Sequence, residues 1–223
     1  MKPRELLAKA TVPGGGYLSL FRRGEDFMIV LGRNELMNSR MSGSEEALAT
    51  MTLERLPWRG APHLLIGGYG MGFTLRAALA ALPTDSRVTV AELVPEIIEW
   101  ARGPMANLAA GCLDDPRVSL VESDVATLIR EADGCFDAIL LDVDNGPDGL
   151  SRVANDGLYS PQGLAEAMAA LKTGGTLAIW SAAPDDRFTR RLVQAGFAVE
   201  QAAVRARSNG KGPRHFIWLA IRR

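Results

Sequence analysis

The sequence HLLIGGYGMGFT at residues 63–74 decides the fold of this chain, together with VTVAE at residues 88–92. In the first stretch an apolar run leads into a glycine-rich turn, and an Ala/Leu-rich segment follows. Glycines allow backbone N–H groups to approach a ligand closely. Glu92 comes 20 residues after Gly72, where an acid at the tip of the next strand accepts hydrogen bonds from ribose hydroxyls. The two stretches predict an adenosine-type cofactor bound to an α/β domain.

The spacing of the glycines narrows the class of cofactor. Gly68, Gly70 and Gly72 form G-x-G-x-G, whereas a dinucleotide fingerprint would place its third glycine at Phe73. No Gly-Lys-Ser/Thr follows, which argues against a triphosphate loop. We expect Gly67 and the three spaced glycines to contact the cofactor. The alternative is a glycine-rich turn that only reverses the chain.

Composition limits the function classes. The chain has 223 residues, 47% of them hydrophobic, and a net charge of −1 from 25 basic and 26 acidic side chains. We therefore expect no nucleic-acid partner and no membrane partner. The two cysteines have neither metal-ligand spacing nor a disulfide framework, so we expect no metal site and a cytoplasmic location. The expected partner is a small-molecule acceptor, and a homodimer is left open.

Residues 1–57 differ in pattern from the rest of the chain. Two apolar, aromatic-containing runs at 17–21 and 27–31 flank a polar turn with a glycine, which predicts a β-hairpin. Ser44 is a suitable N-cap for a helix that Pro57 would end. We predict an N-terminal β appendage with one connecting helix over residues 1–57 and a nucleoside-binding domain over 58–223.

The remainder alternates strand and helix, which predicts a doubly wound α/β fold with a mostly parallel seven-stranded sheet. The last two strands follow each other without a helix, so one of them should run antiparallel. The expected strands are 62–66, 87–92, 117–121, 136–142, 175–181, 197–204 and 214–221. The expected helices are 72–82, 95–109, 124–132, 160–172 and 185–195.

Ordered motifs over residues 62–182 resemble the spermidine synthase (polyamine aminopropyltransferase) group within the class I S-adenosylmethionine-dependent methyltransferase superfamily. The segments IGGYGMG (66–72) and VAELVPEII (90–98) resemble its I-G-G-G-D-G-G and V-E-L-D-P-E-V-I. DPRV at 115–118, with Asp124 six residues after its last residue, resembles D-P-R-V…G-D. FDAILLD at 136–142 resembles Y-D-V-I-I-V-D, and LY at 158–159 with LKTGG at 171–175 resembles L-Y…L-K-P-G-G.

The resemblance implies a role for three acids. Glu92 matches the ribose-binding acid, and Asp124 matches the residue that accepts from the adenine amino group. Asp142 matches the acid at the end of the fourth strand that handles the attacking amine. The chain also departs from the group's pattern, because Gly70 stands where the group keeps Asp and Asn145 where it keeps a second acid. The group's Tyr-His-Glu segment has no clear match in residues 44–48.

The glycine at position 70 bears on the choice of donor. An Asp there would attract the amine of decarboxylated S-adenosylmethionine and repel the carboxylate of S-adenosylmethionine. Two like charges at about 4 Å cost roughly 4 kcal/mol at an effective dielectric near 20. Gly70 removes this penalty, and backbone N–H groups at the helix start can receive a carboxylate. We therefore expect S-adenosylmethionine as the donor, unless another acid replaces the lost one.

Polar residues after the fourth strand are candidates for holding the acceptor. Asp142 should lie at the crevice end of that strand, where it can orient an amine and favour loss of its proton. Asp144 and Asn145 follow in the same loop, and Tyr159 could form a wall of the acceptor pocket; the alternatives are turn residues and core packing.

The sequence as a whole predicts an S-adenosylmethionine-dependent methyltransferase acting on a small acceptor, with an amine as one candidate. The first alternative is an aminopropyltransferase that uses decarboxylated S-adenosylmethionine. The second is a non-catalytic nucleoside-binding or scaffold protein.

Overall fold

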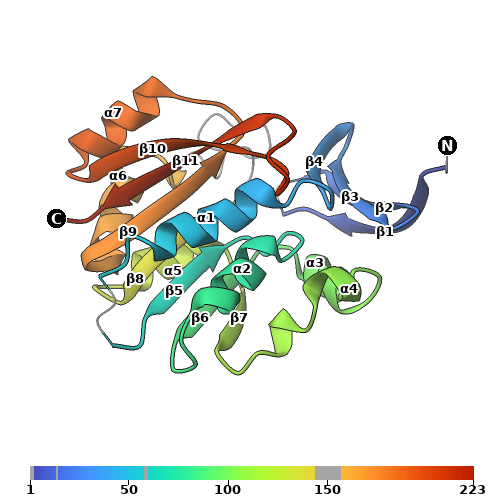
Figure 1. The fold of residues 1–223 in the computed structure, drawn as a ribbon, viewed down its shortest axis with the longest axis horizontal. Helices are drawn as coiled ribbons and strands as arrows, with labels where there is room; N and C mark the ends of the chain where they lie inside the picture. Colours follow the sequence, from blue (N-terminus) through green and yellow to red (C-terminus); the bar gives the residue numbers. More distant parts are fainter. Residues whose placement is uncertain (1–2, 14, 58–59, 144–156) are drawn as a thin grey trace.

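The small sheet at the N-terminus contains four antiparallel strands in sequence order (Figure 1). These are β1 (Glu5–Thr11), β2 (Tyr17–Arg23), β3 (Asp26–Leu31) and β4 (Asn34–Asn38). The computed structural model describes residues 3–13, 15–57, 60–143 and 157–223. The predicted hairpin is β2–β3, and its turn contains Gly24 with a φ of 64°. The sequence did not indicate β1 and β4, which extend the hairpin on both sides.

The main sheet has seven strands in the order β10-β11-β9-β8-β5-β6-β7, as the sequence predicted in number and type. Only β11 runs antiparallel to its described neighbours, β9 and β10. The chain moves from β5 outward to β7 and then returns to the other side of β5 at β8, so the order reverses between β5 and β8. Ligands of open α/β sheets bind at the carboxyl ends of the strands at such a point. The strands are β5 (His63–Gly67), β6 (Arg87–Glu92), β7 (Val118–Glu122), β8 (Phe136–Leu141), β9 (Leu171–Ser181), β10 (Ala198–Arg205) and β11 (Arg214–Ile221).

Helices cover both faces of this sheet (Figure 1). One face packs against α1 (Gly43–Leu53), α2 (Phe73–Ala81), α3 (Pro95–Arg102) and the short α4 (Ala106–Ala109). The other packs against α5 (Val125–Glu131), α6 (Pro161–Ala170) and α7 (Asp186–Gln194). Strand residues alternate between the two layers: Leu64 and Ile66 lie in the first core, and Leu65 lies in the second. None of the described helices is long and apolar enough to cross a membrane.

Three elements differ from the sequence prediction. Helix α1 has Ser42 rather than Ser44 at its N-cap position, and the Ser44 hydroxyl donates to the side chain of Glu45 instead. The helix expected over 95–109 ends at Arg102 and resumes as α4, because Pro104 disfavours helical backbone at Gly103 before it. Strand β9 starts at Leu171, directly after α6, rather than at residue 175. Leu171 already pairs with Phe136 of β8, and the register shifts before the next pair, which joins Ala138 to Thr176.

Helix α1 lies over the main sheet rather than beside the small one (Figure 1). Its start is fixed against the β10–β11 hairpin, because the Gly43 N–H donates to the Ala206 carbonyl oxygen at 2.9 Å. A side chain at Gly43 would meet the Arg207 backbone at 2.5 Å. The division of the chain at residue 57 stays a prediction, but α1 connects the small sheet to the core of the large one.

Asp137 joins three strands of the main sheet and provides a test of the fold. Its Oδ2 accepts from the His63 N–H and from Lys172 Nζ, each at 2.7 Å. Truncation would leave the partly buried His63 N–H without this partner, so we expect Asp137→Ala to lower the free energy of unfolding by about 1–3 kcal/mol. Urea denaturation measures this loss of unfolding free energy. The control Asp133→Ala, at an exposed position, should change the free energy of unfolding by less than about 0.5 kcal/mol. Equal losses in the two variants would contradict the role of Asp137 in joining the strands.

Candidate functional site

The glycine-rich loop after β5 approaches the end of β8 very closely. The Asp142 N–H donates to the Gly67 carbonyl oxygen at 3.0 Å, and the Gly68 N–H donates to the Ala91 carbonyl oxygen at 2.8 Å. Gly68 has a φ of 86°, and a Cβ there would lie 2.7 Å from the Asp142 carbonyl oxygen. Only glycine fits both the backbone angle and the contact. The sequence therefore places the loop, the end of β6 and the end of β8 around one point.

Glu92 ends β6 and holds the glycine-rich loop in place. It is 5% exposed. Its two carboxylate oxygens accept from the Tyr69 N–H and the Val94 N–H, each at 2.9 Å. Burial raises the pKa of Glu92, and hydrogen bonds from backbone N–H groups oppose this rise. The acid predicted to contact a ribose thus lies at the tip of its strand, directly beneath the loop.

Asp124 and Asp142 follow two parallel strands, β7 and β8, at the same carboxyl edge of the main sheet. Asp124 follows β7 and caps α5, with its Oδ1 accepting from the Ala126 N–H at 2.9 Å. Asp142 follows β8, and its Oδ2 accepts from the Thr74 hydroxyl of α2 at 2.7 Å. Burial raises the pKa of Asp142 to about 6, although the Thr74 hydrogen bond lowers it.

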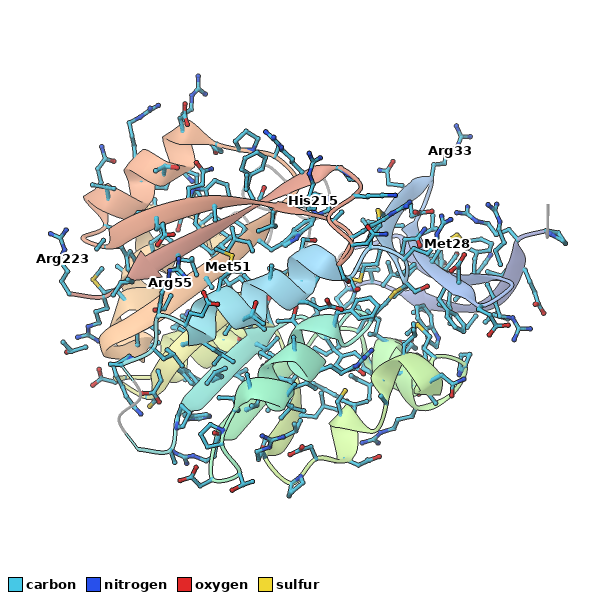
Figure 2. The ribbon with its side chains drawn as sticks, viewed as in Figure 1. Met28, Arg33, Met51, Arg55, His215 and Arg223 are labelled. Carbon is cyan, nitrogen blue, oxygen red and sulfur yellow. The ribbon has the colours of Figure 1, made fainter. Side chains whose placement is uncertain are left out.

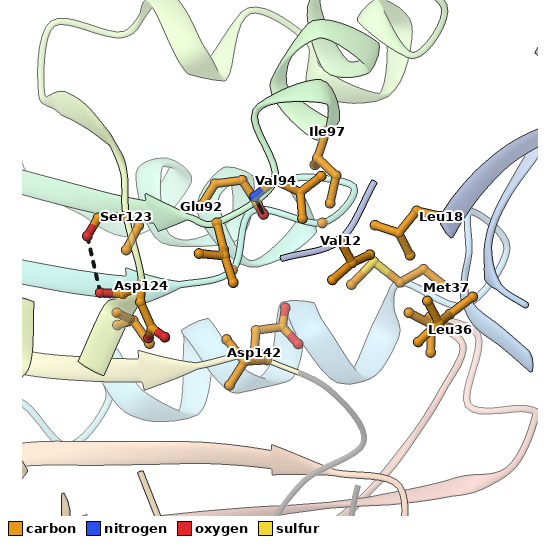
Figure 3. Close-up of a pocket in the computed structure, with 17 residues that line it drawn as sticks. Val12, Leu18, Leu36, Met37, Glu92, Val94, Ile97, Ser123, Asp124 and Asp142 are labelled. Carbon is orange, nitrogen blue, oxygen red and sulfur yellow. Dashed lines mark hydrogen bonds between the residues drawn. The ribbon is translucent and has the colours of Figure 1, made fainter. Parts of the chain in front are cut away.

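One cavity of about 140 Å³ brings these acids together (Figure 3). Glu92, Asp124 and Asp142 lie on its wall, and so do Gly68 and Gly70. The small sheet supplies an apolar wall on the other side, so the appendage closes the cavity rather than standing apart. No Lys or Arg lines the cavity among the described residues, and these residues form no cluster suited to a metal ion. The apolar wall consists of Val12, Leu18, Leu31, Leu36 and Met37.

Met37 of β4 fills the space beside Gly70. Gly70 has a φ of 56°, and a Cβ on it would lie 2.8 Å from both the Sδ and the Cε of Met37. The position where the related group keeps an Asp side chain is therefore filled by a thioether from another element. Space for an anionic ligand group beside Gly70, which the sequence argument assumed, is reduced by this contact.

Sequence reasoning missed a fourth acid, Glu45 of α1. It lines a small cavity of about 10 Å³ together with Asp142, Met37, Tyr69 and Met71. Its Oε2 accepts from the Ser44 hydroxyl at 2.6 Å, and Ser44 Oγ lies 2.8 Å from His215 Nδ1.

His215 lies over the N-terminal end of α1, which places Ser44 and Glu45 against β11 (Figure 2). Burial raises the pKa of Glu45 to about 8, and the negative charge of the nearby Asp142 is the second cause of this rise. A signal for Glu45 was present in the Ser-Glu-Glu helix start, but nothing in the chain order shows that this helix start meets β8.

The structure does not place the other predicted acceptor-binding residues on the cavity wall. Asp144 and Asn145 lie outside the described residues. Tyr159 is 2% exposed and packs edge-on against Phe188 with ring centroids 5.6 Å apart, in the core on the opposite face from α1. It is not among the described residues that line the cavity, so its contact with an acceptor stays a prediction.

Gly67 and Gly72 shape the loop without lining the cavity. A Cβ on Gly67 would lie 2.9 Å from a methyl group of Val125, and one on Gly72 would lie 2.6 Å from the Tyr69 hydroxyl. Their expected contact with a cofactor stays a prediction, and the structure gives each of them a packing role.

Comparison with known proteins identifies a family. Residues 41–186 match the model of the spermine/spermidine synthase domain. The chain is similar to the polyamine aminopropyltransferase of Mycobacterium tuberculosis, with 33% identity over 151 residues, or 63% of this chain and 28% of that protein. It is also similar to polyamine aminopropyltransferase 1 of Streptomyces coelicolor, with 38% identity over 99 residues, or 43% of this chain and 18% of that protein. The chain thus matches less than a third of the length of these relatives.

Solved structures share the fold. The spermidine synthase from Thermotoga maritima superposes with a TM-score of 0.78 over 98% of this chain and 73% of that one, at 19% identity. A probable spermidine synthase from Corynebacterium glutamicum gives a TM-score of 0.68 over 99% of this chain and 81% of that one, at 13% identity. At these identities the likeness concerns the fold alone.

The predicted methyl transfer is wrong, because the matching family model and the named relatives are synthases of polyamines rather than methyltransferases. The physical reason lies in treating Gly70 in isolation. The neighbours of Gly70, Tyr69 and Met71, line the small cavity that also contains Glu45 and Asp142. The loss of an acid at position 70 therefore does not leave this region without acids.

The raised pKa of Glu45 predicts a pH-dependent stability. A carboxyl whose pKa rises from 4.5 to about 8 on folding binds more protons in the folded state, so stability falls as pH rises through that interval. We expect Glu45→Gln to gain thermal stability relative to the wild type progressively between pH 5 and pH 8. Melting curves across this range test it, with Glu46→Gln as the matched control. A constant difference at all pH values would contradict the prediction.

Proposed function

Because this chain belongs to the spermine/spermidine synthase domain family, we propose that it transfers an aminopropyl group from decarboxylated S-adenosylmethionine to a small amine. The observation that carries the proposal is the placement of Glu92, Asp124 and Asp142 around one cavity at the point where the strand order reverses. Ligands of open α/β sheets bind at that point.

In this proposal the donor's nucleoside occupies the larger cavity. Glu92 would accept from the ribose hydroxyls and Asp124 from the adenine amino group, while the apolar side chains of the small sheet cover the other face. Val94 and Ile97 extend the apolar surface on the side of α3. A concave, mainly apolar site with a few polar groups is the usual form of a cofactor site.

The charges of the site support an aminopropyl donor over a methyl donor. Decarboxylated S-adenosylmethionine has a sulfonium and an ammonium and no carboxylate, and the acceptor is also an amine. The cavity has three acids on its wall and, among the described residues, no Lys or Arg. An acidic, partly desolvated site attracts cations and repels a carboxylate.

The reaction needs positioning and the removal of one proton. The acceptor nitrogen attacks the aminopropyl carbon attached to sulfur, a C–N bond forms, the C–S bond breaks, and methylthioadenosine leaves with the electron pair. The nitrogen then loses a proton. Asp142 lies at the end of β8 and its pKa is raised to about 6 by burial, so it can orient the amine and accept this proton.

Release of methylthioadenosine tests the proposed reaction. The purified protein should release it from decarboxylated S-adenosylmethionine only when a diamine such as putrescine is present, with a stoichiometric rise in the aminopropylated product. Binding of the donor without turnover by any of a panel of diamines would instead support a nucleoside-binding protein.

Asp142→Asn keeps the shape of the side chain and removes its charge. We expect the single-turnover rate of transfer to fall by about 10²- to 10⁴-fold, the range for a positioned acid or base, while donor affinity stays within about threefold. The exposed Asp133→Asn, at the other end of the strand, is the matched control. Equal rates for the wild type and Asp142→Asn would show that Asp142 only ends its strand.

Glu92→Ala should weaken nucleoside binding. A charge-assisted pair of hydrogen bonds to the ribose contributes roughly 2–3 kcal/mol, and the same carboxylate holds the glycine-rich loop through Tyr69. Calorimetry with methylthioadenosine measures the ribose and adenine contacts without the aminopropyl tail. The exposed Glu99→Ala, on α3, should bind normally. Unchanged binding by folded Glu92→Ala would exclude the ribose contact.

A further inference from the structure

An ammonium on the donor needs an acidic partner that residue 70 does not supply. Gly70 has no side chain, and Met37 fills the adjacent space with its Sδ and Cε. Met37 lines both the larger cavity and the small one, so it stands where the two adjoin. Asp142 also lines both. A tail that extends from the larger cavity past these two residues reaches Glu45.

The small cavity has the size of a single ammonium group. Its volume of about 10 Å³ is close to the minimum that holds one water molecule, roughly 10–15 Å³, and an ammonium is similar in size. Carboxyl groups of Glu45 and Asp142 lie on its wall, while Tyr69, Met71 and Phe73 provide an apolar remainder. A cation placed there would have two carboxylates and little water around it, which strengthens its interaction with both.

We propose that Glu45 determines donor specificity in this protein by binding the ammonium of the donor's aminopropyl tail, in the place of the acid that is missing at Gly70. This inference rests on the proposed function. The acid that binds the ammonium then comes from the start of α1 and not from the glycine-rich loop.

Ordered contacts hold Glu45 in this position. Its Oε2 accepts from the Ser44 hydroxyl at 2.6 Å, and the hydroxyl of Thr74 donates to Asp142 at 2.7 Å and lies 3.3 Å from the backbone oxygen of Glu45. Ser44 is itself held by His215 of β11 at 2.8 Å. Both acids are therefore presented by packed elements, and little side-chain freedom is lost when a ligand binds.

Binding of the ammonium should displace a proton. The titratable groups that face Glu45 are Asp142 from the end of β8 and Glu46 on α1, with His215 beyond Ser44. Burial and the neighbouring Asp142 raise the pKa of Glu45 to about 8, so the empty site holds a proton at neutral pH. An ammonium favours the carboxylate form, so the proton leaves to solvent as the donor enters.

The same arrangement discriminates against S-adenosylmethionine. Its α-carboxylate would lie next to two acids, and the small cavity does not have room for a carboxylate beside the ammonium. Rejection by charge and by volume is a form of specificity built against the wrong ligand. Methylthioadenosine has the nucleoside but no ammonium, so its binding does not depend on Glu45.

Calorimetry with three nucleosides tests the inference: decarboxylated S-adenosylmethionine, S-adenosylmethionine and methylthioadenosine. Glu45→Gln should bind the decarboxylated donor about 10- to 100-fold more weakly, as expected for loss of a charge-assisted contact. Its affinity for methylthioadenosine should change by less than about twofold, and this binding also shows that the variant is folded. Glu46→Gln, the next residue on the helix, should bind all three as the wild type does.

Proton release gives a second measurement. Titration of the wild type with the decarboxylated donor near pH 7, in buffers of different ionisation enthalpy, should show release of up to one proton that is lost in Glu45→Gln. Glu45→Asp, which keeps the charge on a shorter side chain, should retain more of the preference for the decarboxylated donor than Glu45→Gln.

The outcomes separate this inference from the proposed function. If the wild type prefers the decarboxylated donor and Glu45→Gln keeps that preference, the role of Glu45 is wrong and the proposed function stands. Equal losses for the decarboxylated donor and methylthioadenosine would also overturn it, because Glu45 would then act on the nucleoside or the fold. If the wild type binds S-adenosylmethionine more tightly than its decarboxylated form, the proposed function itself fails.

Discussion

The buried carboxylate of Glu92 is the constraint on which the site depends. Its two oxygens accept from the backbone N–H groups of Tyr69 and Val94, so it joins the end of β6 to the loops after β5 and β6. A buried carboxylate is costly unless such donors satisfy it. Because the loop is held at Tyr69, its next residue, Gly70, faces β4, and the cavity opens between the main sheet and the small sheet.

Closure by the small sheet gives the cavity two unlike sides. The strand ends of the main sheet contribute acids, whereas Val12, Leu18 and Met37 contribute apolar surface. A flat, aromatic base and a ribose can lie between such walls. The raised pKa values of Asp142 and Glu45 both have burial as their first cause. Met37 of the small sheet lines the small cavity together with both acids, so the appendage forms part of the surroundings of residues with which it shares no strand.

The sequence predicted those features that depend on local pattern. The strand-to-glycine-loop motif and Glu92 follow from spacing, and the reversed strand follows from the absence of a helix between β10 and β11. It failed where contacts join distant parts of the chain. Nothing in residues 34–38 indicates that Met37 fills the space beside Gly70, because this contact depends on how the small sheet sits on the large one. Pro104 indicates the break of the helix at Gly103, and the prediction of one helix over 95–109 did not take it into account.

The error about the reaction arose from the same limitation. A missing acid was taken as a missing charge, although charge acts through space and can be supplied from any element that reaches the same point. Here the start of α1 reaches it, because Gly43 lets the helix begin directly against the β10–β11 hairpin and Ser44 is held by His215. Glu45 and Asp142 are far apart in the chain, and they come together because both line the same small cavity. A motif therefore specifies which residues are near a ligand more reliably than it specifies the total charge around that ligand.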